Sequence, residues 1–152
     1  MTRGQQGMAL PLALLALVVI GAVVAGGFTL GLLEQRTGQN TLFAVQAAGA
    51  AEAGAVAVVG EWQALGLGAL MPGDSISLPA VQLPAGTAYQ AAVRRLNPEL
   101  FQLRVTGTRA DADGGMLARR ELGLVLRRVE STDSGAPPVT LLGNRPWNWL
   151  TP

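Results

Sequence analysis

The side chains best placed to do chemistry in this chain are Asp111 and Asp113, which precede Gly114 and Gly115. Alternating carboxylates followed by glycine also occur in calcium-binding loops. A calcium ion needs about six to eight oxygen ligands, and no glutamate stands at the distance that would complete such a loop. Asp-Ala-Asp-Gly-Gly also supplies the residues of a tight hairpin turn. We therefore expect a turn at residues 111–115 and no metal site.

The composition excludes most other catalytic chemistry. The chain of 152 residues has no Cys and no His, which excludes disulfides, thiolate nucleophiles, imidazole bases and most transition-metal sites. The pair Asp111 and Asp113 alone does not define the catalytic geometry of a hydrolase. We expect a protein that is not an enzyme and that uses no cofactor.

All 11 basic residues are arginines, and eight of them lie between residues 94 and 128, where only four acidic residues stand. The simplest interpretation is a solvated strand face whose charges discourage aggregation of the sheet. A basic surface that meets lipid headgroups, DNA or an acidic partner subunit remains open. The net charge of +1 does not require nucleic acid as an obligatory partner. The eight are Arg94, Arg95, Arg104, Arg109, Arg119, Arg120, Arg127 and Arg128.

Alternation of apolar and polar residues predicts the strands that carry these charges. Residues 101–106 alternate at period two, Leu122, Leu124 and Leu126 repeat the pattern, and residues 89–96 give a third strand. The predicted turn between the first two makes them a hairpin. We expect an antiparallel sheet of three or four strands.

An apolar segment at the start of the chain predicts the element on which this sheet packs. Residues 8–33 contain no charge, and about 20 apolar residues suffice to cross the hydrocarbon core of a membrane. Arg3 precedes the segment, while Glu34 and Arg36 cancel after it, which favours a single pass with a cytoplasmic N-terminus. We expect residues 8–33 to span a membrane and to contact its lipid.

The same helix is expected to continue over residues 34–70, which contain no proline and many helix-forming residues. Residues 47–58 are nearly all Ala, Gly and Val, so another helix or a sheet can approach them closely. Gly27 and Gly31 stand at the GxxxG spacing, although such a match is common by chance in a chain with 20 glycines. A proline and a glycine then end the helix, and the β domain is expected over residues 71–130.

The predicted fold is therefore α+β, with a long N-terminal helix whose C-terminal half carries a small antiparallel sheet. A flexible tail is expected over residues 131–152, because residues 131–138 are rich in Ser, Gly and Pro. The tail brings Trp147 and Trp149 to the end of the chain. On a strand the two rings share one face, where they either anchor a partner or pack back on the protein's own sheet or helix.

Two stretches of the chain carry a family pattern. The first, residues 3–12, reads Arg-Gly-Gln-Gln-Gly-Met-Ala-Leu-Pro-Leu, and the second, residues 43–54, reads Phe-Ala-Val-Gln-Ala-Ala-Gly-Ala-Ala-Glu-Ala-Gly. Together they resemble the N-terminal region of type IV prepilins, especially the minor-pilin group. The resemblance implies a leader over residues 1–7, cleavage by a prepilin peptidase between Gly7 and Met8, and methylation of the new N-terminus.

The resemblance also implies assembly into a fibre through the long helix. Leu12, Gly27, Gly31 and Glu34 would lie on that assembly helix, and the partners would be other pilin or pseudopilin subunits. Major pilins usually carry a glutamate at the fifth mature position, where this chain has Leu12. The departure implies an accessory subunit, at or near the fibre tip, of a type IV pilus or a type II secretion pseudopilus. Such a subunit waits in the bacterial inner membrane and reaches the periplasm or cell surface on assembly.

A second hypothesis remains open, in which the helix is only an anchor or an export signal. Ala22-Val-Val-Ala25 offers small residues at which a signal peptidase could cut. The sheet face or the Trp147 and Trp149 pair would then carry the function of a membrane-anchored or exported binding module. The apolar and helix-forming residues after the cut, residues 28–33 in particular, argue against an ordinary signal.

Overall fold

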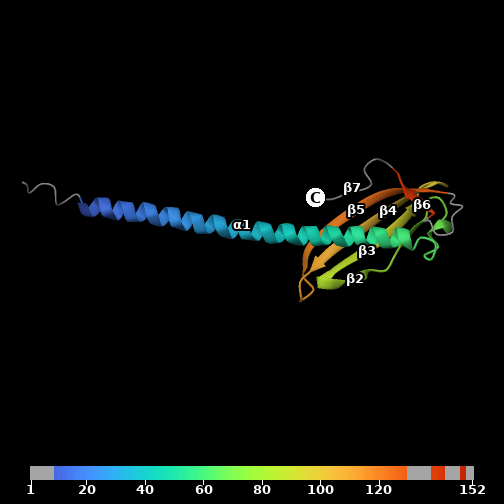
Figure 1. Cartoon of the computed structure of the whole chain (residues 1–152), viewed down its shortest axis with the longest axis horizontal. Coiled ribbons are helices and arrows are strands. Elements are labelled where there is room, and N and C mark those ends of the chain that lie inside the picture. The colour runs from blue at the N-terminus through green and yellow to red at the C-terminus, as the bar shows by residue number, and fades with distance from the viewer. Residues whose placement is uncertain (1–8, 130–137, 143–147, 150–152) are drawn as a thin grey trace, which may run out of the picture. The chain divides into compact units, whose positions relative to one another are not determined.

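The computed structural model describes residues 9–129, 138–142 and 148–149 of the chain, and Figure 1 shows its elements. They confirm the predicted α+β class, with one long N-terminal helix and an antiparallel sheet. The chain divides into two compact units, Met1–Gln39 and Asn40–Pro152. The elements in chain order are α1 (Ala9–Gly60), η1 (Leu67–Ala69), β1 (Ser75–Ser77), β2 (Val81–Leu83), η2 (Pro84–Gly86), β3 (Thr87–Arg95), β4 (Leu100–Ala110), β5 (Met116–Arg128), β6 (Val139–Leu141) and β7 (Asn148–Trp149).

The described part of the first unit is the N-terminal part of α1. Every side chain from Leu10 to Gln39 is exposed, and the helix is long and apolar enough to cross a membrane. The hydroxyl groups of Thr29 and Thr37 donate hydrogen bonds of 2.9 Å to the carbonyl oxygens of Ala25 and Leu33. Because both hydroxyl groups are hydrogen-bonded within the helix, neither brings an unsatisfied polar group into an apolar environment.

The second unit holds the sheet. Its strands are all antiparallel, in the order β1-β3-β4-β5-β6, with β2 also pairing with β3 and β7 with β5. The three long strands β3, β4 and β5 are those predicted from the sequence. The four short strands at the two edges were not predicted, and they raise the sheet from three or four strands to seven.

The predicted hairpin turn joins β4 to β5. The Asp111 carboxylate accepts hydrogen bonds from the backbone N–H groups of Asp113, at 3.1 Å, and Gly115, at 2.5 Å. Gly114 has a φ of 84°, a conformation that favours glycine. The turn prediction is confirmed, and the Asp111 side chain acts as the acceptor that holds the turn together.

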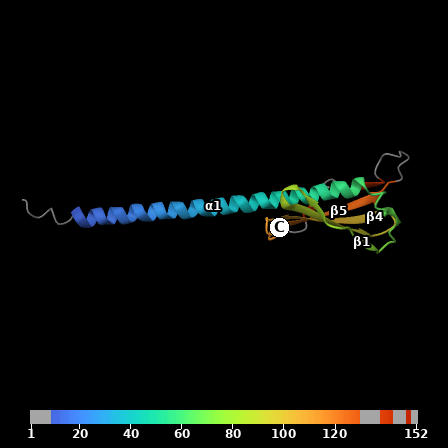
Figure 2. The same cartoon turned by 90° about the horizontal axis from the view of Figure 1, so that it is seen from below.

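One face of the sheet packs on residues of α1 within the second unit, as Figures 1 and 2 show. The helix contributes buried small residues at helical spacing, which are Ala47, Ala51, Ala55 and Val58. The predicted close approach over residues 47–58 is confirmed. The strands contribute the larger buried side chains, which are Val93, Phe101, Leu103, Val105, Leu122, Leu124 and Leu126. Their alternation along each strand is the period of two that marked these strands in the sequence.

Two glycines set the distance between helix and sheet. A Cβ added at Gly107 of β4 would lie 2.0 Å from the carbonyl oxygen of Ala47 and 2.6 Å from the amide nitrogen of Ala51. A Cβ at Gly54 of α1 would lie 2.5 Å from Cδ2 of Tyr89. Neither position accepts a side chain without movement of its neighbours, because Gly107 lies against the backbone of α1 and Gly54 lies against the side chains of Tyr89 and Val105.

The long helix ends at Gly60, whereas the sequence predicted that it continues to residue 70. Trp62 turns under the end of the helix, where its ring is 2% exposed and meets the Phe101 ring edge to face at 5.1 Å. Arg95 connects the loop after the helix to the turn between β3 and β4, because its guanidinium donates to the carbonyl oxygen of Leu70 at 2.5 Å and to that of Pro98 at 2.7 Å. Burial of one large ring therefore outweighs the local helix propensity.

The segment predicted as a flexible tail contributes two strands. β6 pairs with β5 from Leu126 to Arg128, and β7 pairs with β5 at Leu122 and Gly123. Trp149 thus belongs to β7 by its backbone, while its side chain and the whole of Trp147 lie outside the described residues. The shared face expected for the two tryptophans stays a prediction. Most of the predicted linker, residues 131–137, also lies outside the described residues.

Candidate interaction surface

The face of α1 that points away from the sheet is apolar. Its exposed residues recur every three or four positions, and three of them are large and apolar, with exposed fractions of 54%, 63% and 66% for Leu42, Val45 and Val56. A helix that lies on a sheet normally turns charged and polar residues to water on this face. We call this face the Glu52 stripe, after its one charged member. It consists of Leu42, Val45, Gly49, Glu52 and Val56.

An apolar groove of about 420 Å³ adjoins the Glu52 stripe. It lies between the end of α1 and strands β5 and β6, and Val56 belongs to both features. Its walls carry almost no polar side chain, so it suits an apolar occupant and no charged ligand. The principal lining side chains are Val56, Val59, Leu124, Leu126, Val139 and Leu141.

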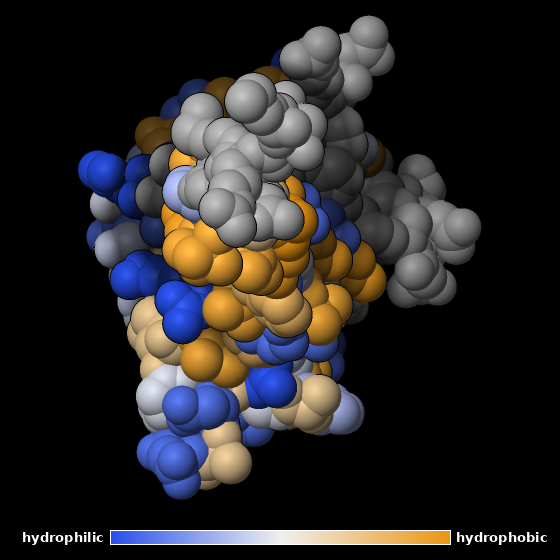
Figure 3. All heavy atoms as spheres, turned by 90° about the vertical axis from the view of Figure 1, so that its left-hand side faces the viewer, coloured by the Kyte–Doolittle hydropathy of each residue, from blue (hydrophilic) through white to orange (hydrophobic). Residues whose placement is uncertain are grey.

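In the first unit, the residues predicted for assembly lie on an uncovered helix. Leu12 is 69% exposed, and a Cβ added at Gly27 or Gly31 would meet no atom within 4 Å. The two glycines line a shallow hollow of about 380 Å³ beside Val24, Phe28 and Leu32. Figure 3 shows hydrophobic residues gathered where the N-terminal end of α1 faces the viewer. The predicted processing residues Gly7 and Met8 lie outside the described part of the chain.

Only three charged residues stand on the whole of α1, and they are Glu34, Arg36 and Glu52. All three are exposed, and none of their side chains makes an ion pair with another described residue. Glu34 was predicted as an assembly residue. Arg36 and Glu52 were not, although their position on an otherwise apolar helix is visible in the sequence.

The eight clustered arginines do not form one surface. The strand register places Arg94, Arg104, Arg119 and Arg127 on the sheet face away from α1, and the other four on the face toward it. On the far face, Glu121 lies 3.6 Å from Arg104 and 4.0 Å from Arg119. The predicted local excess of positive charge is therefore divided between two faces and partly neutralised on one.

Arg109, on the helix side, is a structural residue. Its Nε donates to the side-chain oxygen of Gln46 at 2.8 Å, and its guanidinium lies 5.9 Å from the centre of the Phe43 ring. Both partners belong to α1, so the arginine joins β4 to the helix by a hydrogen bond and a cation–π contact. No local pattern predicts this pairing, because the two residues of the hydrogen bond lie 63 positions apart.

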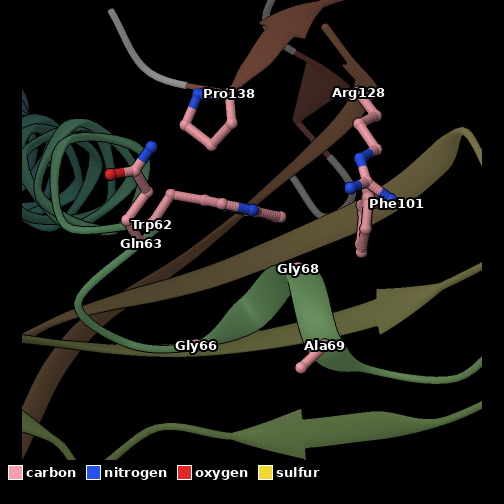
Figure 4. A pocket seen from close by; sticks show the side chains of 8 residues that line it. All are labelled: Trp62, Gln63, Gly66, Gly68, Ala69, Phe101, Arg128 and Pro138. Atoms are coloured by element: carbon pink, nitrogen blue, oxygen red, sulfur yellow. The ribbon is translucent and has the colours of Figure 1, made fainter. Parts of the chain in front are cut away.

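A second hollow, of about 270 Å³, opens where Trp62 passes under the end of the helix (Figure 4). Trp62 and Phe101 are its aromatic lining, with the Arg128 side chain beside Phe101 and Pro138 above Trp62 in this view. Among the described residues that line it, Arg128 is the only one with an ionisable side chain. One cation without a base or nucleophile beside it offers no catalytic arrangement.

The chain was compared with models of protein families, with curated proteins and with solved structures, and none of them matches it. The surfaces most suited to function are therefore identified by physical features alone. They are the uncovered N-terminal part of α1, the Glu52 stripe and the apolar groove beside that stripe.

Proposed function

We propose that this protein is an accessory subunit of a fibre of the type IV pilus or type II secretion pseudopilus kind. The subunit waits in the bacterial inner membrane and assembles through α1, at or near the tip of the fibre or during its initiation. Its partners are other pilin or pseudopilin subunits, and a prepilin peptidase prepares it by cleavage between Gly7 and Met8 and by methylation.

One observation carries this proposal. A single helix, α1, has an uncovered apolar part that can cross a membrane and a further part that bears an antiparallel sheet while exposing the apolar Glu52 stripe. A simple anchor requires apolar residues only within the membrane. An apolar stripe on the part beside the sheet is explained by helix packing against neighbouring subunits.

The likeness of residues 3–12 and 43–54 to minor pilins supports the same proposal. Leu12 stands where a major pilin has a carboxylate, so the subunit brings no charge to that point of the fibre.

The test is mass spectrometry of the N-terminus after expression with and without a prepilin peptidase. We expect a methylated N-terminus at Met8 only when the peptidase is present. Gly7→Trp places a bulky residue directly before the cut and is expected to abolish processing. Gly4→Trp, three residues earlier, is the matched control and is expected to be processed.

The opposite outcome also has a definite meaning. A chain that keeps Met1 or Thr2 with the peptidase present, or that is cut after Ala25, is a membrane-anchored or exported module. The proposal of a fibre subunit would then be wrong, and the function would belong to the second unit.

A further inference from the structure

The isolated charges of α1 point to a specific contact. Glu52 is the fourth of the five residues of the Glu52 stripe, with Gly49 and Val56 as its neighbours on that face. Within the described part of the chain its carboxylate has neither a hydrogen bond nor an ion pair. An apolar partner that covered this stripe would bury the carboxylate without compensation, which is strongly unfavourable. The occupant of the stripe must therefore bring a cation to Glu52.

Arg36 is the one cation that α1 carries, and it also stands on an apolar background. Leu32 and Leu33 before it are 58% and 54% exposed. Glu34, two residues earlier, projects about 200° away around the helix, so its charge does not share the face of Arg36. We call this second face the Arg36 face. It consists of Gly26, Thr29, Leu33 and Arg36, which follow one another at intervals of three, four and three residues.

The two faces are complementary residue by residue. The Glu52 stripe has the same intervals, with Leu42, Val45, Gly49 and Glu52. Each residue lies 16 positions after its counterpart, since 52 minus 36 is 16. At this offset a leucine meets a glycine twice, Leu42 beside Gly26 and Leu33 beside Gly49. Close packing of helices requires such an alternation of large and small residues.

The remaining pair of the four is also compatible. Thr29 would lie beside Val45, and the Thr29 hydroxyl is already bonded to the carbonyl oxygen of Ala25. The threonine therefore presents its methyl group to the valine at no cost in unsatisfied polar atoms. The contact thus pairs one charge with its opposite and apolar groups with each other.

We propose that a second copy of this chain packs its Arg36 face on the Glu52 stripe, with the two helices parallel and offset by 16 residues. The inference rests on the proposed function, because copies in one membrane share one orientation and an offset of 16 residues, about 24 Å, arises when one copy leaves the membrane during assembly. The two faces differ, so each copy keeps one free face after pairing. Such heterologous contacts do not close into a dimer, and they leave a free face at each end of a row of copies for the other pilin subunits. Glu52 and Arg36 fix the offset, as single polar residues do in coiled coils.

The chain has no native Cys, which permits a direct test by disulfide formation in detergent, where no bilayer holds the copies at one depth. Thr29→Cys and Val45→Cys together, in one chain, are expected to give a ladder of disulfide-linked multimers on mild oxidation. Each single variant is expected to remain monomeric. The matched control combines Thr29→Cys with Val56→Cys, which lies on the same stripe at the wrong offset, and is expected to give no ladder.

A charge exchange tests the role of the ion pair. Glu52→Arg or Arg36→Glu, each added to the Thr29→Cys and Val45→Cys chain, is expected to lower the ladder yield about tenfold or more. Both exchanges together are expected to restore it. Near-ultraviolet circular dichroism checks that each variant keeps its fold, because both residues are exposed in the single chain. Rescue of Glu52→Arg by Arg104→Glu, and not by Arg36→Glu, would show that the sheet supplies the cation and would overturn the proposal.

The outcomes separate this contact from the proposed function. A Met8 terminus without a ladder overturns the contact and leaves the fibre subunit standing. Disulfide-linked multimers of a chain that keeps its leader support the contact between copies and contradict processing of the protein as a prepilin. Dimers from Val45→Cys alone would show stripe-to-stripe pairing, which contradicts the 16-residue offset.

Discussion

Gly107 is the residue on which the docking of the helix depends most directly. The atoms that a side chain would meet there belong to the backbone of α1, the carbonyl oxygen of Ala47 and the amide nitrogen of Ala51. A flexible side chain can move aside, whereas a helix backbone can move only as a whole. The space for even one methyl group must therefore come from separation of the helix and β4.

We expect Gly107→Ala to lower the free energy of unfolding by about 2 to 3 kcal/mol or more, because overpacking against backbone has no local relief. Gly49→Ala is the matched control, since a Cβ there meets no atom within 4 Å. That variant is expected to be neutral or to gain about 0.5 to 1 kcal/mol from its better helix propensity. Urea unfolding in detergent measures both. Equal effects of the two variants would show that Gly107 is not a point of contact.

At the scale of single elements, the end of α1 is decided by Trp62. The ring lies in the core against Phe101, and the chain then passes Gly66, whose φ of 64° lies in the left-handed region. Arg95 fixes the exit of the loop through the carbonyl oxygen of Leu70. Helix, loop and first strand are thus connected by one aromatic contact and one arginine.

Trp62→Ala is expected to cost about 3 to 5 kcal/mol, a large part of the stability of a small domain. Loss of near-ultraviolet circular dichroism at a lower urea concentration would record the change. Gln63→Ala, at the exposed neighbouring position, serves as the control and is expected to change stability by less than about 0.5 kcal/mol. A small effect of Trp62→Ala on the free energy of unfolding would mean that the Trp62 ring is not needed to fix the loop.

Elements whose cause is local could be predicted from the sequence. The strands β3, β4 and β5 follow from alternation, and their turn follows from the chemistry of Asp111 and Gly114. The end of α1 at Gly60 could not be predicted, because the burial of Trp62 depends on Phe101, which lies far along the chain. The short edge strands were missed for a similar reason, since three residues carry no readable period.

The candidate surface was also predictable only in part. The apolar N-terminal part of α1 is evident from composition, and Leu12, Gly27 and Gly31 lie on it as expected. The Glu52 stripe was not recognised, because Ala, Gly and Val occupy both the buried and the exposed faces of residues 42–58. Only the position of the sheet distinguishes one face from the other.

At the scale of the whole molecule, the chain divides its apolar residues between two environments. The second unit buries its apolar side chains in a core between helix and sheet. The first unit exposes every described apolar side chain, from Leu10 at 71% to Leu33 at 54%. Water does not stabilise such a surface, so the location of the protein is set by the first unit and its fold by the second.

We expect Val19→Arg combined with Val23→Arg to release the protein from membranes. Each arginine near the centre of a spanning helix costs about 2.5 to 3.5 kcal/mol, and two of them offset most of the favourable insertion energy of the apolar segment. Carbonate extraction measures the fraction that remains in the membrane pellet. Val19→Leu with Val23→Leu is the apolar control and is expected to remain fully membrane-bound. Retention of the arginine variant would mean that the segment is not held by lipid.

Tyr89 is the only tyrosine of the chain, and its ring lies against Gly54 at the contact between α1 and the sheet. The protein therefore carries a built-in optical probe at the contact between helix and sheet. The ultraviolet resonance Raman bands of this one phenol, which are distinct from those of the three tryptophans, depend on whether the ring faces a helix backbone or water. Spectroscopy of the unlabelled chain can thus follow the separation of helix and sheet in real time, in membranes as well as in detergent.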